Sequence, residues 1–456
     1  MKNLDALTIT EISREIREGT LSSTTLVEAC LRHIDGLESS VQAWVTICLA
    51  EALQCARELD DEARAGKLRG TLHGVPVGIK DIYSVAGVTT TAGARGFADQ
   101  IPTTDATTVK RLKAAGTIIL GKTATTEFAY TDPAATRNPW NFGRTPGGSS
   151  SGSAAAVAAG MVPVALGSQT VGSTLRPAAY CGVVGLKPSY GRVSRAGIFP
   201  LAWSLDHVGI FGRSVSDVTH LLQVLAGPDQ EDPTASPLPA PDYHAQFSTM
   251  TRPRLGLVRQ YFLDRSTPEM AAHIESTAER LRSAGAVIEE LPLPESFPLV
   301  HAATRLILAA EAAALHEELF RKHADEYRPR IRATIEAGTL IPAHLYLKAQ
   351  RIRRRFQREM MPILDRVDAL VMPVTPEPAP DLTTTGDGSF CAPWSFAGLP
   401  AISVPSGFSN GRLPLAIQLV GRSLAEERLL AVAHWCESII GRMPSPVASD
   451  QQSAFS

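Results

Sequence analysis

The sequence predicts an α/β protein: a single large domain with a mixed, mostly parallel twisted central sheet that helices cover on both faces. Two observations predict this class. Short apolar runs rich in β-branched residues alternate along the chain with helical segments, a pattern typical of parallel strands joined by crossover helices. The chain also has 456 residues, of which 44% are hydrophobic and 20% charged, so it can bury one large core.

Residues 1–70 are predicted to form an N-terminal helical wrap. Ile9, Ile12 and Ile16 mark the apolar stripe of a first helix. Helical periodicity continues over most of the remainder and ends at the turn around Gly66. The helices are expected within 9–35 and 41–66, and no catalytic residue is expected among them.

Residues 71–227 are predicted to form the core of the sheet and to carry the chemistry. Apolar, β-branched runs indicate strands, and a run of alanines after a serine cluster indicates a helix of small residues. The strands are expected at 72–81, 117–122 and 162–166, and the helices at 104–115 and 154–159.

A stretch rich in Pro, Asp and Ser at 228–241 is the clearest change of composition. It opens a helical middle region, 228–370. C-terminal strands and a helix, 371–456, then complete the same domain. In these two regions helices are expected at 269–284, 299–322, 341–360 and 425–440, and strands at 254–258, 286–291, 370–374 and 401–404.

The charge balance and the cysteines argue against several classes of protein. The formal net charge is −2, which gives no support for a nucleic-acid or membrane partner. The basic run at 351–355 is interpreted as a solvated helix face. The N-terminal sequence MKNLDALTITEISREI is too polar for a signal peptide, and no apolar run is long enough to span a bilayer. With six scattered cysteines read as free thiols, a cytoplasmic protein is expected.

The sequence contains no recognisable metal-binding or nucleotide-binding motif. The eleven histidines form no H-E-x-x-H and no Cys/His pair at ligand spacing. The serine cluster at 147–153 lacks the G-K-[ST] ending of a phosphate loop, and no G-x-G-x-x-G follows a strand. No metal and no cofactor are therefore expected.

Two glycine-serine clusters, Gly147–Ser153 and Gly167–Ser173, are the most unusual feature of the sequence. Taken alone, such clusters are most often flexible or tightly turned loops. The first also matches the nucleophile elbow G-x-S-x-G, which would make Ser150 a nucleophile, but no downstream histidine has a distinctive context. The clusters by themselves leave both a loop and a hydrolase open.

With a lysine upstream, the clusters resemble the signature of the amidase signature family. The matching segments are a lysine motif, a Gly-Gly-Ser-Ser loop, a Ser-Gln-Thr-Val-Gly-Ser loop and C-terminal strands. They lie at 74–76, 79–81, 147–150, 168–173, 181–188, 191–194, 398–405 and 415–421. The resemblance covers most of the chain, and only residues 230–370 show no distinctive match. It implies the amidase signature fold. It also implies a serine hydrolase that cleaves carbon–nitrogen bonds other than peptide bonds, in linear amides.

The resemblance also implies a Ser-cisSer-Lys triad. In it Ser173 is the nucleophile, Ser149 is a bridging serine preceded by a cis peptide bond, and Lys80 is the base. A serine hydroxyl needs a neighbouring base to become a nucleophile. Lysine normally titrates near ~10.4, so it must be desolvated to act as that base.

Other residues of the two loops receive supporting roles from the same resemblance. The oxyanion hole would consist of backbone N–H groups, those of Thr170, Val171, Gly172 and Ser173. Ser150, Ser168 and Gln169 are expected to support the triad, with Ser150 and Ser168 either orienting Lys80 or Ser149 or only fixing the loops.

The second loop departs from the family pattern. Most members carry an acidic residue where Gln169 stands, a glycine where Val171 stands and an arginine where Leu175 stands. Arg176 follows instead, as in a malonamidase-like subgroup in which that arginine holds a substrate carboxylate. A structural ion pair beneath the loop explains Arg176 equally well.

Three stretches rich in aromatic residues are candidate walls of the substrate pocket. Aromatic walls suit an aryl or alkyl group, although core packing accounts for many aromatic residues as well. The stretches are 124–130, with Tyr130, 198–203, and 390–396, with Phe390 and Trp394.

The leading hypothesis is an amidohydrolase that cleaves amide or carbamate (urethane) C–N bonds of a small molecule through an acyl-enzyme on Ser173, with esters as further candidate substrates. The first alternative is the A subunit of a tRNA-dependent amidotransferase, which uses this device to release ammonia from glutamine and needs partner subunits. The second is a non-catalytic binding protein on the same fold. A homodimer is only the base-rate expectation.

Overall fold

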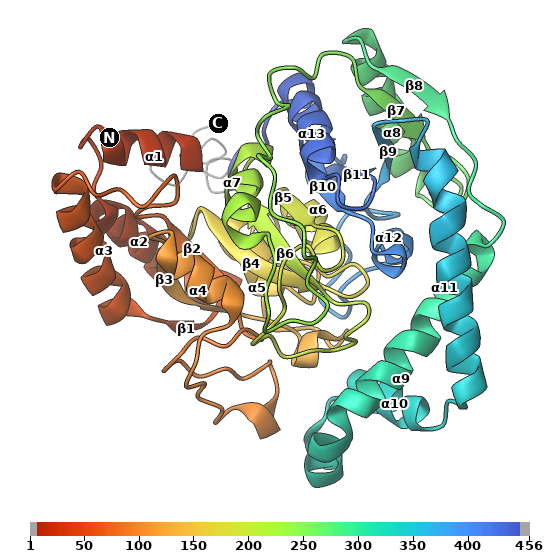
Figure 1. Ribbon diagram of the computed structural model, residues 1–456, viewed down its shortest axis with the longest axis horizontal. Coiled ribbons are helices and arrows are strands. Elements are labelled where there is room, and N and C mark those ends of the chain that lie inside the picture. The colour runs from red at the N-terminus through yellow and green to blue at the C-terminus, as the bar shows by residue number, and fades with distance from the viewer. Residues whose placement is uncertain (1–6, 447–456) are drawn as a thin grey trace.

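One eleven-stranded sheet runs through the molecule (Figure 1). The computed structural model describes residues 7–446, so residues 1–6, the start of the segment tested as a signal peptide, and residues 447–456 lie outside it. The strands are β1 (Trp44–Ile47), β2 (Pro76–Lys80), β3 (Ile118–Thr123), β4 (Val164–Gln169), β5 (Val184–Lys187), β6 (His207–Gly212), β7 (Arg254–Leu257), β8 (Val287–Glu290), β9 (Ala369–Pro373), β10 (Ala401–Phe408) and β11 (Pro414–Val420). Across the sheet their order is β1-β3-β2-β4-β6-β5-β10-β11-β9-β7-β8, so all four predicted regions contribute to it or pack on it.

Helices cover both faces of this sheet, as the sequence predicts. They are α1 (Ile9–Arg17), α2 (Ser23–Val41), α3 (Leu49–Arg64), α4 (Thr107–Ala114), α5 (Ser151–Ala158), α6 (Leu175–Cys181), α7 (Val215–Leu225), α8 (Pro268–Ser283), α9 (Phe297–His323), α10 (Pro329–Thr339), α11 (Ala343–Leu364), α12 (Ala392–Ala397) and α13 (Glu426–Ile440). Successive side chains of a strand point to opposite faces. On β4, Val164 and Leu166 accordingly belong to the core cluster that contains side chains of α7 and α13, whereas Ala165 belongs to the cluster that contains side chains of α2 and α5. In Figure 1, α1–α3 lie at one side of the molecule and α9–α11 at the other.

The sheet is mixed, as predicted, but the expectation that it is mostly parallel is wrong. Among residues 7–446, four neighbouring strand pairs are parallel and six are antiparallel. Parallel pairs need a crossover, such as α4 between β2 and β3. The connections from β5 to β6 and from β10 to β11 contain no helix, and both pairs are antiparallel.

The predicted helical stretch 41–66 is interrupted by a strand. Gln42 adopts a left-handed conformation (φ 55°) and ends α2, and β1 follows as an edge strand paired antiparallel to β3. The helix resumes only as α3. Four residues alternating between half-buried and exposed are too short a pattern to stand out against the helical periodicity around them.

Helix α5 consists of small residues because it lies in the interior. All eight of its residues are buried, and it packs against β2, β3 and β4. At Gly152 a Cβ atom would lie 2.2 Å from the carbonyl oxygen of Ala43, so only glycine fits there. The close approach holds the end of the first serine cluster against Ala43, just before β1, and Ala124, just after β3.

The expectation that no segment is apolar enough to span a bilayer needs correction. Within the described part of the chain, the helical segment Phe297–Glu326, which contains α9, meets that length and composition. In this structure the apolar side chains of α9 are part of the protein core, because α9 packs against α10, α11 and α12. Val300, Ile307 and Leu308 lie in the core cluster beneath α11 and α12.

Candidate active site

The lysine and one serine of the predicted site meet at the carboxyl ends of two parallel strands. β2 ends at Lys80, and β4 ends one residue after Ser168. The register pairs Ile79 of β2 with Leu166 of β4. Because parallel neighbours end at the same edge of a sheet, Lys80 and Ser168 lie together there.

Lys80 is completely buried and contacts two serine hydroxyls. Its Nζ donates hydrogen bonds to Ser149 Oγ at 2.7 Å and to Ser168 Oγ at 2.8 Å. The next residue, Asp81, points away and forms a buried ion pair with Lys122 at 2.8 Å. Burial holds the pKa of Lys80 well below its usual range, and the negative charge of Asp206 opposes this shift only in part.

The first serine cluster is a fixed part of the structure, since its hydroxyls are bonded within the core. The Gly148–Ser149 peptide bond is cis. Ser150 Oγ accepts a hydrogen bond from the N–H of Ser168 at 3.1 Å and donates to the carbonyl of Ser168 at 3.2 Å. Ser151 Oγ donates to the carbonyl of Gly147 at 2.7 Å. Ser150 therefore joins this loop to the end of β4, whereas the Lys80 amine bonds Ser149 and Ser168.

The end of the second serine cluster lines a cavity of about 540 Å³. Ser173, Thr170 and Val171 all line it. The N–H of Ser150 donates to the carbonyl of Ser173 at 3.4 Å, which joins the two loops. Within residues 7–446, the backbone N–H groups of residues 170–173 donate no hydrogen bond to the protein. Unpaired donors beside a reactive hydroxyl are suited to bind an oxyanion.

Gln169 supports the second loop with both ends of its amide. Its Oε1 accepts hydrogen bonds from the N–H groups of Thr174 and Leu175 at 2.9 and 3.0 Å. Its Nε2 donates to Ser395 Oγ at 3.0 Å, and Ser395 Oγ in turn donates to the carbonyl of Val171 at 2.9 Å. A neutral amide thus connects the loop to α6 and α12.

Sequence reasoning did not find Asp206, which stands next to the loop. Its carboxylate accepts hydrogen bonds from Thr170 Oγ1 at 2.6 Å and from the N–H groups of Leu201 and Ala202 at 2.8 and 3.0 Å. Burial raises the pKa of Asp206, although these hydrogen bonds oppose that shift. The one available signal was a carboxylate directly before strand β6.

Arg176 is buried in the wall of the same cavity as Ser173. It donates hydrogen bonds to two backbone carbonyls, those of Gly386 and Gly148, both at 2.6 Å. Its Nε has no partner, and no carboxylate of the described residues lies within 4.0 Å of it, so the ion pair offered as an alternative explanation is absent. Burial lowers its pKa, but a guanidinium stays charged.

The predicted aromatic walls are only partly present. Tyr130 lines the cavity, and its hydroxyl accepts a hydrogen bond from Thr334. Phe390 and Trp394 do not line it: both side chains are fully buried and pack against Phe262 in the core. Their ring size makes them core residues. The cavity is lined instead by helical and loop residues that carried no motif, among them His301, Thr304, Arg305, Asp387 and Ser389.

Metal coordination finds no support in the described part of the chain. No group of three or more His, Cys, Asp or Glu side chains there is placed to hold an ion.

Comparison with known proteins gives a consistent picture. The family model described as Amidase matches residues 25–430. A protein of Roseiflexus castenholzii, named as the A subunit of a glutamyl-tRNA(Gln) amidotransferase, is 38% identical over 95% of both chains.

Solved structures are similar over nearly the whole chain. One, described as part of a vestigial protein complex that reveals the origins of an s-triazine catabolic enzyme, has a TM-score of 0.91 at 31% identity and covers 96% of this chain and 100% of its own. The peptide amidase of Stenotrophomonas maltophilia has a TM-score of 0.85 at 32% identity, with 96% and 98% covered.

The role of Gln169 can be tested by stability. Gln169→Leu should lower the free energy of unfolding by about 1–3 kcal/mol for each buried group left unpaired, measured by denaturant titration. Gln418→Leu is the matched control, because Gln418 is equally buried but donates only one hydrogen bond, to the carbonyl of Phe390. Equal losses in the two variants would contradict the special role of Gln169.

Proposed function

This chain belongs to the amidase family, and from that premise we propose that it is an amidohydrolase that cleaves the C–N bond of a small amide through an acyl-enzyme on Ser173. The observation that carries the proposal is the contact of a fully buried lysine with Ser149, in a loop joined to that of Ser173. Carbamates and esters are further candidate substrates, because an oxyanion hole binds the tetrahedral oxygen whatever the leaving group.

Each group then has one task. Lys80, neutral because it is buried, takes a proton from Ser149, and Ser149 takes one from Ser173 as its Oγ bonds to the carbonyl carbon. The N–H groups of residues 170–173 bind the oxygen that becomes negative. The proton returns through Ser149 to the leaving nitrogen as the C–N bond breaks. Water then cleaves the acyl ester by the same route and restores the Ser173 hydroxyl.

We infer further that the acyl half of the substrate carries a carboxylate, held by Arg176. The buried Arg176 guanidinium forms no ion pair within 4.0 Å among the described residues, and Asp387, which lines the same cavity, opposes the lowering of its pKa by burial only in part. An anionic ligand in the cavity would compensate the remaining charge. The Arg176 side chain lines the same cavity as Ser173, so a carboxylate bound to Arg176 can belong to the molecule whose amide meets Ser173.

A second candidate function comes from the relatives. A protein named as the A subunit of a glutamyl-tRNA(Gln) amidotransferase matches the chain over 95% of both lengths, and on that likeness the site would release ammonia from glutamine within a heteromer. The name also points against the expectation that no nucleic acid is involved. Glutamine hydrolysis measured beside a panel of small amides, together with the native mass of the chain after co-purification, separates the two functions.

Ser173→Ala should lower the turnover of any cleaved amide by at least about 10⁴-fold, because the other groups of the relay have no nucleophile left to serve. A fluorophosphonate should label Ser173 in the wild type, and Lys80→Met should abolish both labelling and turnover. Ser151→Ala is the control: it lies in the same cluster but bonds only Gly147. Normal hydrolysis by the Ser173 variant would refute the assignment.

The pH dependence should report the depressed pKa of Lys80. Because only the neutral amine is a base, kcat/KM should rise as the pH rises through that pKa and reach its plateau well below ~10.4, the value of a free lysine. Asp206→Asn removes a charge that raises the pKa of Lys80, so it should move the acid limb to lower pH. An acid limb centred near the free-lysine value would contradict a neutral Lys80.

Arg176→Met should discriminate between matched substrates. If Arg176 binds a carboxylate, the variant should lose about 10- to 100-fold in kcat/KM for succinamate relative to neutral succinamide, the effect of a charged hydrogen bond worth about 1.5–3 kcal/mol. Using the ratio removes any general damage from the lost bond to Gly148. Arg176→Lys keeps the charge but loses the two-pronged guanidinium, so its succinamate-to-succinamide ratio of kcat/KM should lie between those of the wild type and Arg176→Met. An unchanged ratio in Arg176→Met would show that no carboxylate binds there.

A further inference from the structure

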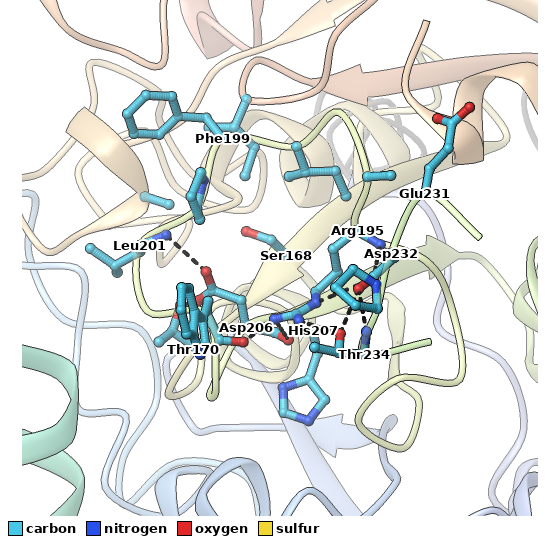
Figure 2. A pocket seen from close by; sticks show the side chains of 17 residues that line it. Ser168, Thr170, Arg195, Phe199, Leu201, Asp206, His207, Glu231, Asp232 and Thr234 are labelled. Carbon is cyan, nitrogen blue, oxygen red and sulfur yellow. Dashed lines mark hydrogen bonds and ion pairs between the residues drawn. The ribbon is translucent and has the colours of Figure 1, made fainter. Parts of the chain in front are cut away.

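A second cavity, of about 380 Å³, reaches the site from another side. We call it the Trp203 cavity and the one lined by Ser173 the Arg176 cavity. Ala129, Thr170 and Leu201 line both cavities and form the wall between them. Figure 2 shows Ser168 and Asp206 among the side chains that line the Trp203 cavity.

One of the two hydroxyls bonded to Lys80, that of Ser168, belongs to a residue that lines the Trp203 cavity. Ser168, whose hydroxyl accepts a hydrogen bond from Lys80, lines this cavity but not the Arg176 cavity, which is lined by Ser173. During hydrolysis the leaving nitrogen receives its proton from the lysine side of the relay. The geometry therefore directs the amine half of the substrate to the Trp203 cavity and the acyl half to the Arg176 cavity.

The charges around the Trp203 cavity suit an amine. Three carboxylates line it, those of Asp206, Glu231 and Asp232, against the single guanidinium of Arg195. Two of these charges are offset, because Arg195 Nε lies 3.7 Å from Asp232 and Lys110 Nζ lies 3.1 Å from Glu231. Asp206 forms no ion pair within residues 7–446, so its carboxylate is the one left for an amine. His207 also lines the cavity, and burial holds its pKa well below the usual range, so it adds no positive charge.

Apolar groups form the remaining wall and favour a hydrocarbon group on the amine. Ile198, Phe199 and Trp203 line the cavity, and the Trp203 side chain is 60% exposed. An indole face attracts a cation placed over it, and an amine is released in water as its ammonium form. The backbone carbonyl of Trp203, which accepts a hydrogen bond from Tyr190, does not depend on the indole.

We propose that the Trp203 cavity is the subsite for the amine half of the substrate, and that the protein cleaves N-alkyl or N-arylalkyl amides in preference to primary amides. The proposal rests on the proposed hydrolase function and adds the class of leaving group. The acyl–N bond breaks, the nitrogen gains the proton returned through Ser149, and the released amine takes a further proton from water in the acidic cavity.

The kinetic test compares an N-benzyl amide with the primary amide of the same acid, N-benzylsuccinamate and succinamate. Trp203→Ala should raise KM for the N-benzyl amide about tenfold, the effect expected for loss of one aromatic contact, and leave kcat/KM for succinamate within about twofold. Phe142→Ala, an exposed aromatic residue outside both cavities, should change neither. Equal effects of Trp203→Ala on both substrates would overturn the proposal.

A binding test separates this proposal from the proposed function. Calorimetry on the Ser173→Ala protein should show benzylammonium binding more tightly than neutral benzyl alcohol, and phenylacetate more weakly than either, with benzylammonium binding weakened about tenfold by adding Trp203→Ala. Failure to hydrolyse any amide contradicts the hydrolase function. Benzylammonium binding that is absent, or independent of Trp203, contradicts the subsite.

Discussion

The burial of Lys80 without a carboxylate beside it is the constraint on which the site depends. Strand alternation sends the carboxylate of Asp81 to the opposite face, where it pairs with Lys122. Among the described residues, the hydrogen bonds of Lys80 Nζ go only to hydroxyls, those of Ser149 and Ser168, so it is not half of an ion pair and is suited to the role of base that we propose for it. A buried ion pair in the same place would hold the ammonium form and could not accept a proton.

The neighbouring elements keep that environment dry and fixed. Parallel pairing of β2 and β4 places Lys80 beside Ser168, and α5 reaches the strands closely because its side chains are small. The second loop is likewise held by an uncharged side chain, the Gln169 amide. Gln169 stands where the family usually has an acid, and Leu175, fully buried, stands where it usually has an arginine. Without the arginine, a buried carboxylate would lack its counter-charge, so an amide that both accepts and donates is the compatible residue.

The sequence could bring Lys80, Ser149, Ser173 and Gln169 into one predicted site because each lies in a short motif whose order along the chain carries the information. The structure places Lys80 in contact with Ser149. Sequence reasoning missed Asp206, whose contact with Thr170 joins a loop to a strand end 36 residues later and leaves no local pattern. It misplaced Phe390, just before α12, and Trp394, within α12, because composition does not say which side chains face a cavity and which face the core. It expected parallel strands because hydrophobic runs identify a strand but not the direction of its neighbour.

The two cavities make the site electrically asymmetric across a thin wall. Two guanidiniums, those of Arg176 and Arg305, line the Arg176 cavity with one carboxylate, that of Asp387. Three carboxylates line the Trp203 cavity with one guanidinium, that of Arg195. A substrate with an anionic acyl half and an amine that becomes cationic on release matches this field in one orientation and opposes it in the other. The orientation that matches also places the leaving nitrogen on the side of Ser168, whose hydroxyl is bonded to Lys80. Charge and proton transfer therefore select the same pose, which aligns the scissile bond before any contact specific to the substrate is made.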